Sequence, residues 1–221
     1  MYAHFTDADA SYLRFLQATD DCPDLAVAEH RRVLLVWLNS WGCRQFEIAW
    51  HPRASEEIRA WYDEYRHPLC RRDKNLWELS AVELSKAARA YASLSERTAS
   101  WYGPIERPSG RKKRVGKTGA AKIMFAIRPR AFPPWDGPIT EYFGYDGSAA
   151  SYLAYLEDVR RKLEELEAHC DSKGIGLGDL ADYLGRPTST VAKLIDEFHW
   201  VTVTKKWSAS DLDNLCRLCR L

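Results

Sequence analysis

Residues 114–136 read RVGKTGAAKIMFAIRPRAFPPWD, and the interpretation of the whole chain depends on this stretch. Residues 118–127 are almost entirely apolar and predict a helix. Four prolines follow between Arg128 and Pro138. Because proline lacks a backbone donor and disfavours helix in the residue before it, we expect an extended, ordered crossing there rather than helix or sheet.

The rest of the chain has helical periodicity on both sides of this stretch. Apolar residues recur at helical spacing in residues 11–17, 25–41, 55–65, 76–94 and 148–170, with a short helical turn at 139–143. We expect Ser55 to cap the third of these helices and Gly42 to end the second. Gly103-Pro104 and Pro108-Ser109-Gly110 predict a loop.

The last fifty residues form a smaller unit. Residues 177–184 and 188–198, joined by a turn at Gly185-Arg186-Pro187, have helix–turn–helix spacing, and Val201–Val203 predicts a short strand. The fold class is therefore all-α with a helix-turn-helix-like C-terminal extension. We divide the chain into a helical lobe (1–100), a basic hairpin with the long helix (101–172) and the extension (173–221).

The bulk composition predicts a soluble, cytoplasmic chain. The 221 residues are 46% hydrophobic and 29% charged, with no apolar run of membrane length and no secretory signal. Six cysteines in such a chain indicate a reducing compartment. Cys216 and Cys219 form a CxxC, but no second pair exists at metal-ligand spacing, so we read them as apolar helix residues and expect no metal. We expect a monomer.

The positive charge is concentrated in one region. Residues 101–130 contain nine Lys and Arg against the single acid Glu106, whereas the flanking segments are slightly acidic. Such segregation attracts a polyanion to one face of a nearly neutral molecule. The residues expected to contact the DNA backbone here are Arg111, Lys112, Lys113 and Arg114.

The motif inside this region resembles the helix-hairpin-helix DNA glycosylase superfamily. The resemblance rests on Val115-Gly116-Lys117-Thr118, the apolar helix, and the proline loop ending in Trp135-Asp136, with 19 residues from Lys117 to Asp136. It implies a two-lobed helical fold, and a hairpin whose Gly116 and Thr118 hold a DNA phosphate. A phosphate loop of nucleotide hydrolases fits less well, because five residues separate Gly110 from Gly116 and no apolar strand precedes them.

The resemblance also implies catalytic residues. Asp136 is the carboxylate that would assist cleavage of the glycosidic bond, and Lys117 occupies the position of the nucleophilic lysine in strand-nicking members. Lys122, one turn further along, is an alternative amine. Asp136 could instead be only a helix cap, and Lys117 only a phosphate contact.

The residues around a flipped base are predicted from composition and position. Trp135 and Trp41 are the stacking candidates, although core packing is the alternative for Trp41. Arg44 and Gln45, at the end of a first-lobe helix, are candidates to fill the gap in the duplex.

The sequence therefore predicts a DNA N-glycosylase that flips out and removes a modified or damaged base without a cofactor, in DNA repair or in defence against phage. A lyase activity depends on whether a lysine attacks the sugar. The alternatives are a non-catalytic DNA-binding protein that uses the basic segment and the C-terminal helix pair, and an RNA-binding protein.

Overall fold

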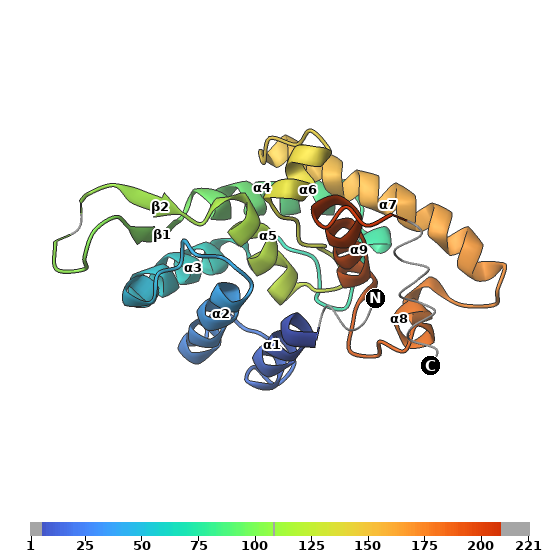
Figure 1. Cartoon of the computed structure of the whole chain (residues 1–221), viewed down its shortest axis with the longest axis horizontal. Helices are drawn as coiled ribbons and strands as arrows, with labels where there is room; N and C mark the ends of the chain where they lie inside the picture. Colours follow the sequence, from blue (N-terminus) through green and yellow to red (C-terminus); the bar gives the residue numbers. More distant parts are fainter. Residues whose placement is uncertain (1–5, 108, 209–221) are drawn as a thin grey trace.

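Helix α5 (Gly116–Ile127) forms the centre of the protein. Every residue from 119 to 127 except Lys122 is buried. A helix that is apolar around its whole circumference has to be covered on all sides. In the computed structural model, which describes residues 6–107 and 109–208, α5 packs against α2 (Ala28–Ser40) and α4 (Ala81–Glu96), and lies in the middle of the view in Figure 1.

The other elements surround α5, and the described part of the chain is mostly helical. On the N-terminal side they are α1 (Thr6–Gln17), η2 (Ile48–Trp50), α3 (His51–Tyr65), η3 (Leu76–Glu78), β1 (Thr98–Trp101) and β2 (Lys112–Arg114). After α5 come α6 (Gly137–Tyr142), α7 (Ala149–Asp171), η4 (Leu177–Asp179), α8 (Leu180–Tyr183), α9 (Val191–His199) and η5 (Trp200–Thr204). The long helix α7 packs against α4 (Figure 1). No helix in the described ranges is both long and apolar enough to cross a membrane.

Most predicted helices are confirmed, including α5, the short α6 and the long α7. The extended crossing predicted over 128–138 is shorter, because residues 128–132 form a hydrogen-bonded turn and Pro138 lies in α6, which leaves residues 132–136 without helix or strand. Gly42 ends α2 with a φ of +79°.

Four starts were predicted wrongly. α1 begins at Thr6 rather than Ser11, and α2 begins at Ala28 rather than Leu25. The third helix begins at His51, with a proline in its first turn, and Ser55 lies inside it, where its hydroxyl accepts a hydrogen bond from Arg31. The helix predicted over 76–94 is two elements, because Ser80 and Glu83 form a capping box that starts α4.

The predicted loop is flanked by two strands that were not predicted, since the described residues between Trp101 and Lys112 contain no helix or strand and the residues on each side form a β-ribbon. β1 and β2 pair antiparallel, with Ser100 opposite Lys113 and Trp101 opposite Lys112. Thr98 and Ser100 are buried because β1 packs against α3. The buried strand supplies one edge of backbone groups, and the charged segment pairs with that edge while its side chains remain in solvent. The charges of residues 111–114 alone did not indicate a strand, because their pairing partner, the buried strand β1, precedes the basic segment in the sequence.

The strand predicted at Val201–Val203 is also wrong. α9 runs directly into a π-helical turn, η5, in which the Lys205 N–H bonds to the Trp200 carbonyl five residues earlier at 2.9 Å. Val201 and Val203 are both buried, which explains the apolar pattern without a strand. Cys216 and Cys219 lie outside the described residues, and Cys22, Cys43, Cys70 and Cys170 are free thiols.

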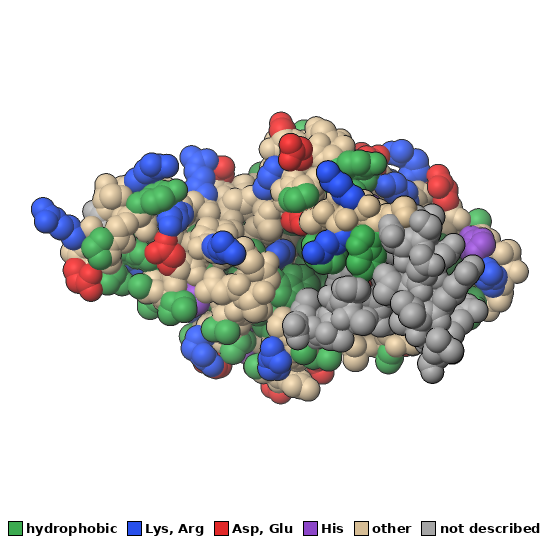
Figure 2. Space-filling view, viewed as in Figure 1, with side chains coloured by type: hydrophobic (Ala, Val, Ile, Leu, Met, Phe, Trp, Pro, Cys, Tyr) green, Lys and Arg blue, Asp and Glu red, His purple; other side chains and the backbone are tan. Residues whose placement is uncertain are grey.

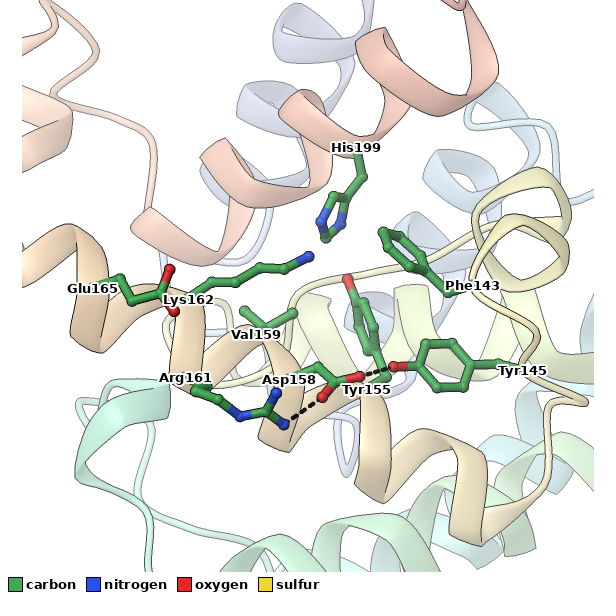
Figure 3. A pocket seen from close by; sticks show the side chains of 9 residues that line it. All are labelled: Phe143, Tyr145, Tyr155, Asp158, Val159, Arg161, Lys162, Glu165 and His199. Atoms are coloured by element: carbon green, nitrogen blue, oxygen red, sulfur yellow. Dashed lines mark hydrogen bonds and ion pairs between the residues drawn. The ribbon is translucent and has the colours of Figure 1, made fainter.

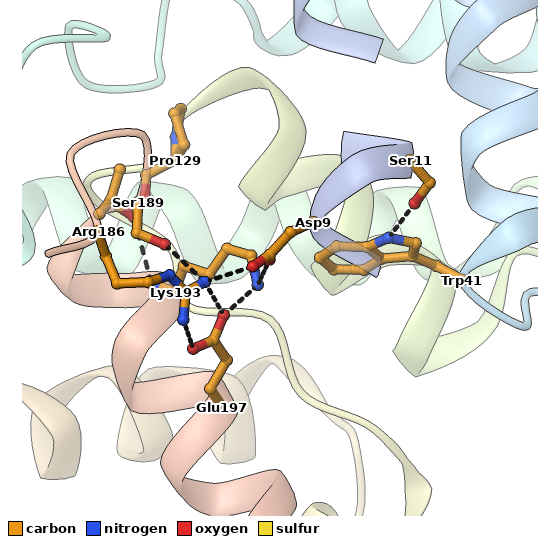
Figure 4. Close-up of polar contacts among 9 residues, drawn as sticks. Asp9, Ser11, Trp41, Pro129, Arg186, Ser189, Lys193 and Glu197 are labelled. Atoms are coloured by element: carbon orange, nitrogen blue, oxygen red, sulfur yellow. Dashed lines mark hydrogen bonds and ion pairs between the residues drawn. The ribbon is translucent and has the colours of Figure 1, made fainter. Parts of the chain in front are cut away.

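A buried charge cluster attaches the C-terminal unit to α1 (Figure 4). Glu197 in α9 accepts hydrogen bonds from both Arg186 at 2.8 Å and Lys193 at 2.5 Å, and Asp9 in α1 pairs with the same two cations. Glu197 is 1% exposed and Lys193 is 2% exposed. Near by, Thr190 donates to the Pro129 carbonyl at 2.7 Å. These contacts place α9 beside α5 and its proline loop.

Replacing Glu197 by Gln should lower the free energy of unfolding by about 3–5 kcal/mol, because two buried cations lose the carboxylate they share. Urea denaturation at pH 7 measures this change. The matched control is Glu164→Gln on the exposed side of α7, which should change stability by less than about 0.5 kcal/mol. Equal, small effects of the two substitutions would show that the buried cations do not depend on Glu197 for compensation of their charge.

Candidate active site

Asp136 lies at the point where the proline loop turns into α6. It is the N-cap of this helix, and its Oδ1 accepts a hydrogen bond from the Ile139 N–H at 2.9 Å. Pro138, in the first helical turn, has a backbone geometry suited to starting a helix and needs no donor there. The capping role is therefore real, and it fixes the direction of a half-buried carboxylate. A fixed carboxylate is also what a catalytic role requires, so capping and catalysis are compatible.

The first turn of α5 lies beside the Asp136 loop. The indole N–H of Trp135 donates to the Lys117 carbonyl at 3.3 Å. On its other side the Lys117 side chain lies against Gly147, where φ is +86° and a Cβ would come within 2.9 Å of the Lys117 Cδ. Tyr91 in turn donates to the Gly147 carbonyl at 3.1 Å. Three segments distant in sequence thus converge on one side of α5.

Gly116 begins α5 with a φ of +68°, a conformation that favours glycine, and no side chain caps the helix. Gln45 stabilises this turn, because its side-chain amide donates to the Val115 carbonyl at 2.7 Å. Gly119 leaves room for it, since a Cβ there would lie 2.7 Å from the Gln45 Nε2. Gln45 is thus part of the hairpin support, whereas its neighbour Arg44 is exposed.

Lys122 is the one polar residue in the buried part of α5. Its ammonium donates to the Trp41 carbonyl at 2.5 Å and lies 5.6 Å from the centre of the Trp41 ring. The ammonium of Lys193 lies 5.4 Å from the same ring. Lysine so close to aromatic faces is stabilised by cation–π attraction. Lys122 therefore points toward α9.

Asp196 on α9 completes this group and was not predicted from the sequence. The pKa of Asp196 is raised to about 7, chiefly by burial; the negative charge of Asp136 also raises it, whereas Lys193 and Lys122 lower it. A carboxyl group that stays protonated near neutral pH beside a second carboxylate is the arrangement by which enzymes assign acid and base roles. The only sequence signal was a Lys193…Asp196-Glu197 pattern on an amphipathic helix, which argued against DNA recognition by this helix.

The two predicted base-stacking tryptophans have different environments. Trp135 is 1% exposed, and its ring packs against Tyr91, Tyr152 and Tyr155 at centroid distances of 5.7, 5.2 and 4.9 Å. Both faces are covered, so Trp135 positions its neighbour Asp136 and cannot stack on a base in this conformation. Trp41 is half-buried, lies 6.1 Å from Phe125 in a stacked arrangement and donates to Ser11 at 3.0 Å (Figure 4).

The cations of the ribbon alternate with acids. Lys113 pairs with Glu47 and Arg114 with Glu96, whereas Arg111 lies 4.4 Å from the Tyr102 ring centre. Arg111 and Lys112 are exposed. Figure 2 shows Lys and Arg side chains along the ribbon with Asp and Glu among them. The accessible positive charge of this face is therefore smaller than the sequence count suggests.

Asp196 is within electrostatic range of Asp136, Lys122 and Lys193, whereas Lys117 is not among the charges that act on it and has its side chain against Gly147. Within the described ranges no three His, Cys, Asp or Glu side chains come together where they could hold a metal ion. Comparisons with protein families, with curated proteins and with solved structures find no match to this chain.

Asp196→Asn should become stabilising relative to wild type as the pH rises. The pKa of Asp196 is higher in the folded chain than in the unfolded chain, so its contribution to stability is fully present below about pH 4 and is lost as pH rises to about 7. Asparagine resembles the neutral acid at every pH. The stability difference between variant and wild type should grow by roughly 2–3 kcal/mol between pH 5 and pH 8.

Denaturant melts at several pH values measure this difference, and Asp146→Asn is the control. Hydrogen bonds from Ser151 and Ser148 lower the pKa of Asp146 to about 2, so its contribution is lost only as pH falls below about 4. The Asp146 difference should therefore stay constant from pH 5 to pH 8. A constant difference for Asp196→Asn as well would contradict the raised pKa.

Proposed function

We propose that the protein is a DNA N-glycosylase that removes a modified or damaged base from DNA. The observation that supports this most is the position of Asp136, held at the start of α6 beside the first turn of α5 and close enough to Asp196 to raise its pKa. A carboxylate beside the N-terminus of a helix that begins at a glycine is one part of the arrangement that the sequence resemblance implies; the segment before this glycine is strand β2 and not the helix that the resemblance implies.

DNA would be held by the first turn of α5 and by the ribbon. The backbone N–H groups of an uncapped helix N-terminus, together with the helix dipole, favour a phosphate. Arg111 and Lys112 add exposed charge near by, and Lys113 and Arg114 can exchange their surface glutamate partners for phosphates at little cost. Contacts of this kind bind the backbone without reading sequence.

The reaction would use the two carboxyl groups in different roles. Asp136 stabilises the positive charge that develops on the sugar as the C1′–N bond breaks, and takes a proton from the attacking water. The oxygen of that water bonds to C1′. Asp196, protonated near neutral pH, donates its proton to the departing base. The products are a free base and an abasic site.

A lysine nucleophile is the variant of this mechanism. If Lys117 or Lys122 attacks C1′ in place of water, a Schiff base forms and the strand is nicked. Lys122 is favoured by its direction toward Asp196, and Lys117 by its position in the motif. Borohydride reduction traps a Schiff base covalently. Applied to Lys117→Gln and to Lys122→Gln, it identifies the nucleophile as the lysine whose replacement abolishes the trapped protein–DNA complex.

The rival proposal is a non-catalytic DNA-binding protein. The structure argues against a recognition helix in the C-terminal unit. Lys193 is the one basic residue of α9 before His199, and it is 2% exposed and paired with Glu197. The ribbon would then carry all DNA contacts. Binding without base release in the experiment below would favour this rival.

Asp136→Asn should abolish base release while the protein remains folded. Asparagine caps a helix about as well as aspartate, so the α6 cap is preserved and only the charge is lost. The assay uses duplex and single-stranded DNA that carries damaged or phage-type modified bases, followed by alkali to cleave abasic sites. We expect activity to fall by about 100-fold or more, since removal of one transition-state partner typically costs 10²–10³.

Ser148→Ala is the matched control for this experiment. Ser148 caps α7 as Asp136 caps α6, so its loss should cost about 1 kcal/mol of stability and leave base release intact. Full activity in Asp136→Asn would show that Asp136 is only a cap. Absence of any product from wild type on every substrate, with DNA binding intact, would contradict the glycosylase.

The double substitution Arg111→Gln, Lys112→Gln should weaken DNA binding by the same factor on every sequence. It should also reduce the slope of log K against log salt by about 2, roughly one for each lost phosphate contact. Binding measured by fluorescence anisotropy at several salt concentrations gives this slope. Arg71→Gln, Lys173→Gln removes two exposed cations elsewhere and should leave it unchanged. An unchanged slope in the ribbon variant would exclude the ribbon as a DNA contact.

A further inference from the structure

A pocket separate from the Asp136 site lies between α7, the segment that follows α6, and the end of α9 (Figure 3). Its volume is about 330 Å³. The residues that define its chemistry are Phe143, Tyr145, Tyr155, Asp158, Lys162 and His199. Asp136 does not line it. Tyr155 connects this pocket to the Asp136 loop. It lines the pocket, and its hydroxyl donates to the carbonyl of Pro134, two residues before Asp136, at 3.2 Å.

His199 is the unusual group in this pocket. It is 2% exposed, and within the described residues neither of its buried ring nitrogens has a hydrogen-bond partner. Burial, and next the charge of Lys162, lower the pKa of His199 to about 4, so near neutral pH the ring is uncharged. A neutral imidazole offers one N–H donor and one acceptor nitrogen. Buried polar groups are nearly always hydrogen-bonded, so two unpaired nitrogens on a residue that lines a cavity point to a ligand.

The backbone around His199 supports the same conclusion. His199 is the last residue of α9, immediately before the π-helical turn η5. Such turns are rare and are frequently found at functional sites, because the extra residue per turn redirects side chains. Here the turn follows the residue whose ring nitrogens lack partners.

The walls of the pocket are aromatic. The Phe143 ring lies edge-on to the His199 ring at 5.2 Å between centroids, and Tyr155 lies 6.2 Å from His199. The Tyr145 hydroxyl donates to Asp158 and the Tyr155 hydroxyl to Pro134, so both hydroxyl groups are already engaged within the protein. Tyr155 is 1% exposed, so the partly exposed rings of Phe143 and Tyr145 are what remains for a ligand, and flat aromatic surfaces favour a flat aromatic partner.

Lys162 supplies the charge. Its ammonium lies 4.8 Å from the Phe143 ring centre and points into the pocket beside His199 (Figure 3). The other cation, Arg161, is paired with Asp158 at 2.6 Å. Glu165, one turn along α7, also lines the pocket but makes no ion pair with Lys162 among the described residues. Lys162 is therefore placed to receive an anionic group next to the aromatic walls.

We propose that this pocket binds one nucleotide, with its base against the rings of Phe143 and Tyr145 and hydrogen-bonded by His199, and its phosphate on Lys162. The volume lies at the lower end of the range for small-molecule pockets, which suits one base with its sugar and phosphate rather than a dinucleotide. The inference does not depend on the glycosylase activity. A free nucleoside monophosphate and a nucleotide at the end of a DNA strand present the same chemistry, and the experiment separates them.

The test is isothermal titration of the full-length protein with the common nucleoside 5′-monophosphates, the matching nucleosides, inorganic phosphate, and short single strands with a 5′-phosphate. We expect saturable binding of at least one monophosphate, about tenfold weaker binding of its nucleoside, and no binding of phosphate alone, since each 1.4 kcal/mol corresponds to a factor of ten. Tighter binding of the strands than of the monophosphates would assign the pocket to a strand end.

Two variants locate the site. Lys162→Gln should weaken monophosphate binding about tenfold and leave nucleoside binding unchanged, whereas Lys173→Gln, an exposed lysine beyond α7, should have no effect. His199→Phe preserves the ring and its packing, so the variant should fold as well as wild type, which a thermal melt checks, but should lose base binding. In wild type the ¹⁵N signals of the His199 imidazole should shift on saturation. Folded wild type that binds no probe, or variants that bind as wild type does, would overturn the proposal.

Discussion

The buried indole of Trp135 connects the parts of this protein on which the site depends. Its ring packs against Tyr91 of α4 and against Tyr152 and Tyr155 of α7, while its N–H bonds to the Lys117 carbonyl in α5. One side chain thus joins three helices to the extended crossing that precedes α6. Because Asp136 is the next residue, the direction of its carboxylate is set by the packing of Trp135 as much as by its own helix cap.

The second constraint is the placement of α9 by buried charge. Arg186 and Lys193 share Glu197 and Asp9 with little exposure to water, an arrangement that adds little stability when intact but is costly to break on one side. This cluster holds α9 in one register. The same helix then directs Asp196 toward Lys122 and Asp136, and His199 toward the aromatic pocket. Two different chemical environments are therefore positioned by one short helix.

The candidate site was predicted in part. Asp136, Lys117 and Lys122 stand in a motif whose spacing is local. In the structure Asp136 caps α6, Lys117 lies in the first turn of α5 and Lys122 lies in the middle of that buried helix. Asp196 was missed because nothing near it in the sequence distinguishes it from a solvated acid. Its raised pKa comes from burial by segments far away in the chain. Trp135 is the opposite case, a residue that was predicted to stack on a base because it lies beside Asp136. In the structure it is packed in the core.

The sequence by itself determined the elements whose signals lie within a few residues, because helix periodicity, proline and glycine act on the local backbone. These are the buried helix α5, the proline crossing, the cap at Asp136 and the end of α2 at Gly42. Only the tertiary structure decided which charged residues are desolvated and which strand edges are occupied. The β-ribbon depends on the burial of Thr98 and Ser100 against α3, and the properties of Asp196 and His199 depend on what covers α9. Desolvation and strand pairing are set by neighbours in space, which a local pattern does not contain.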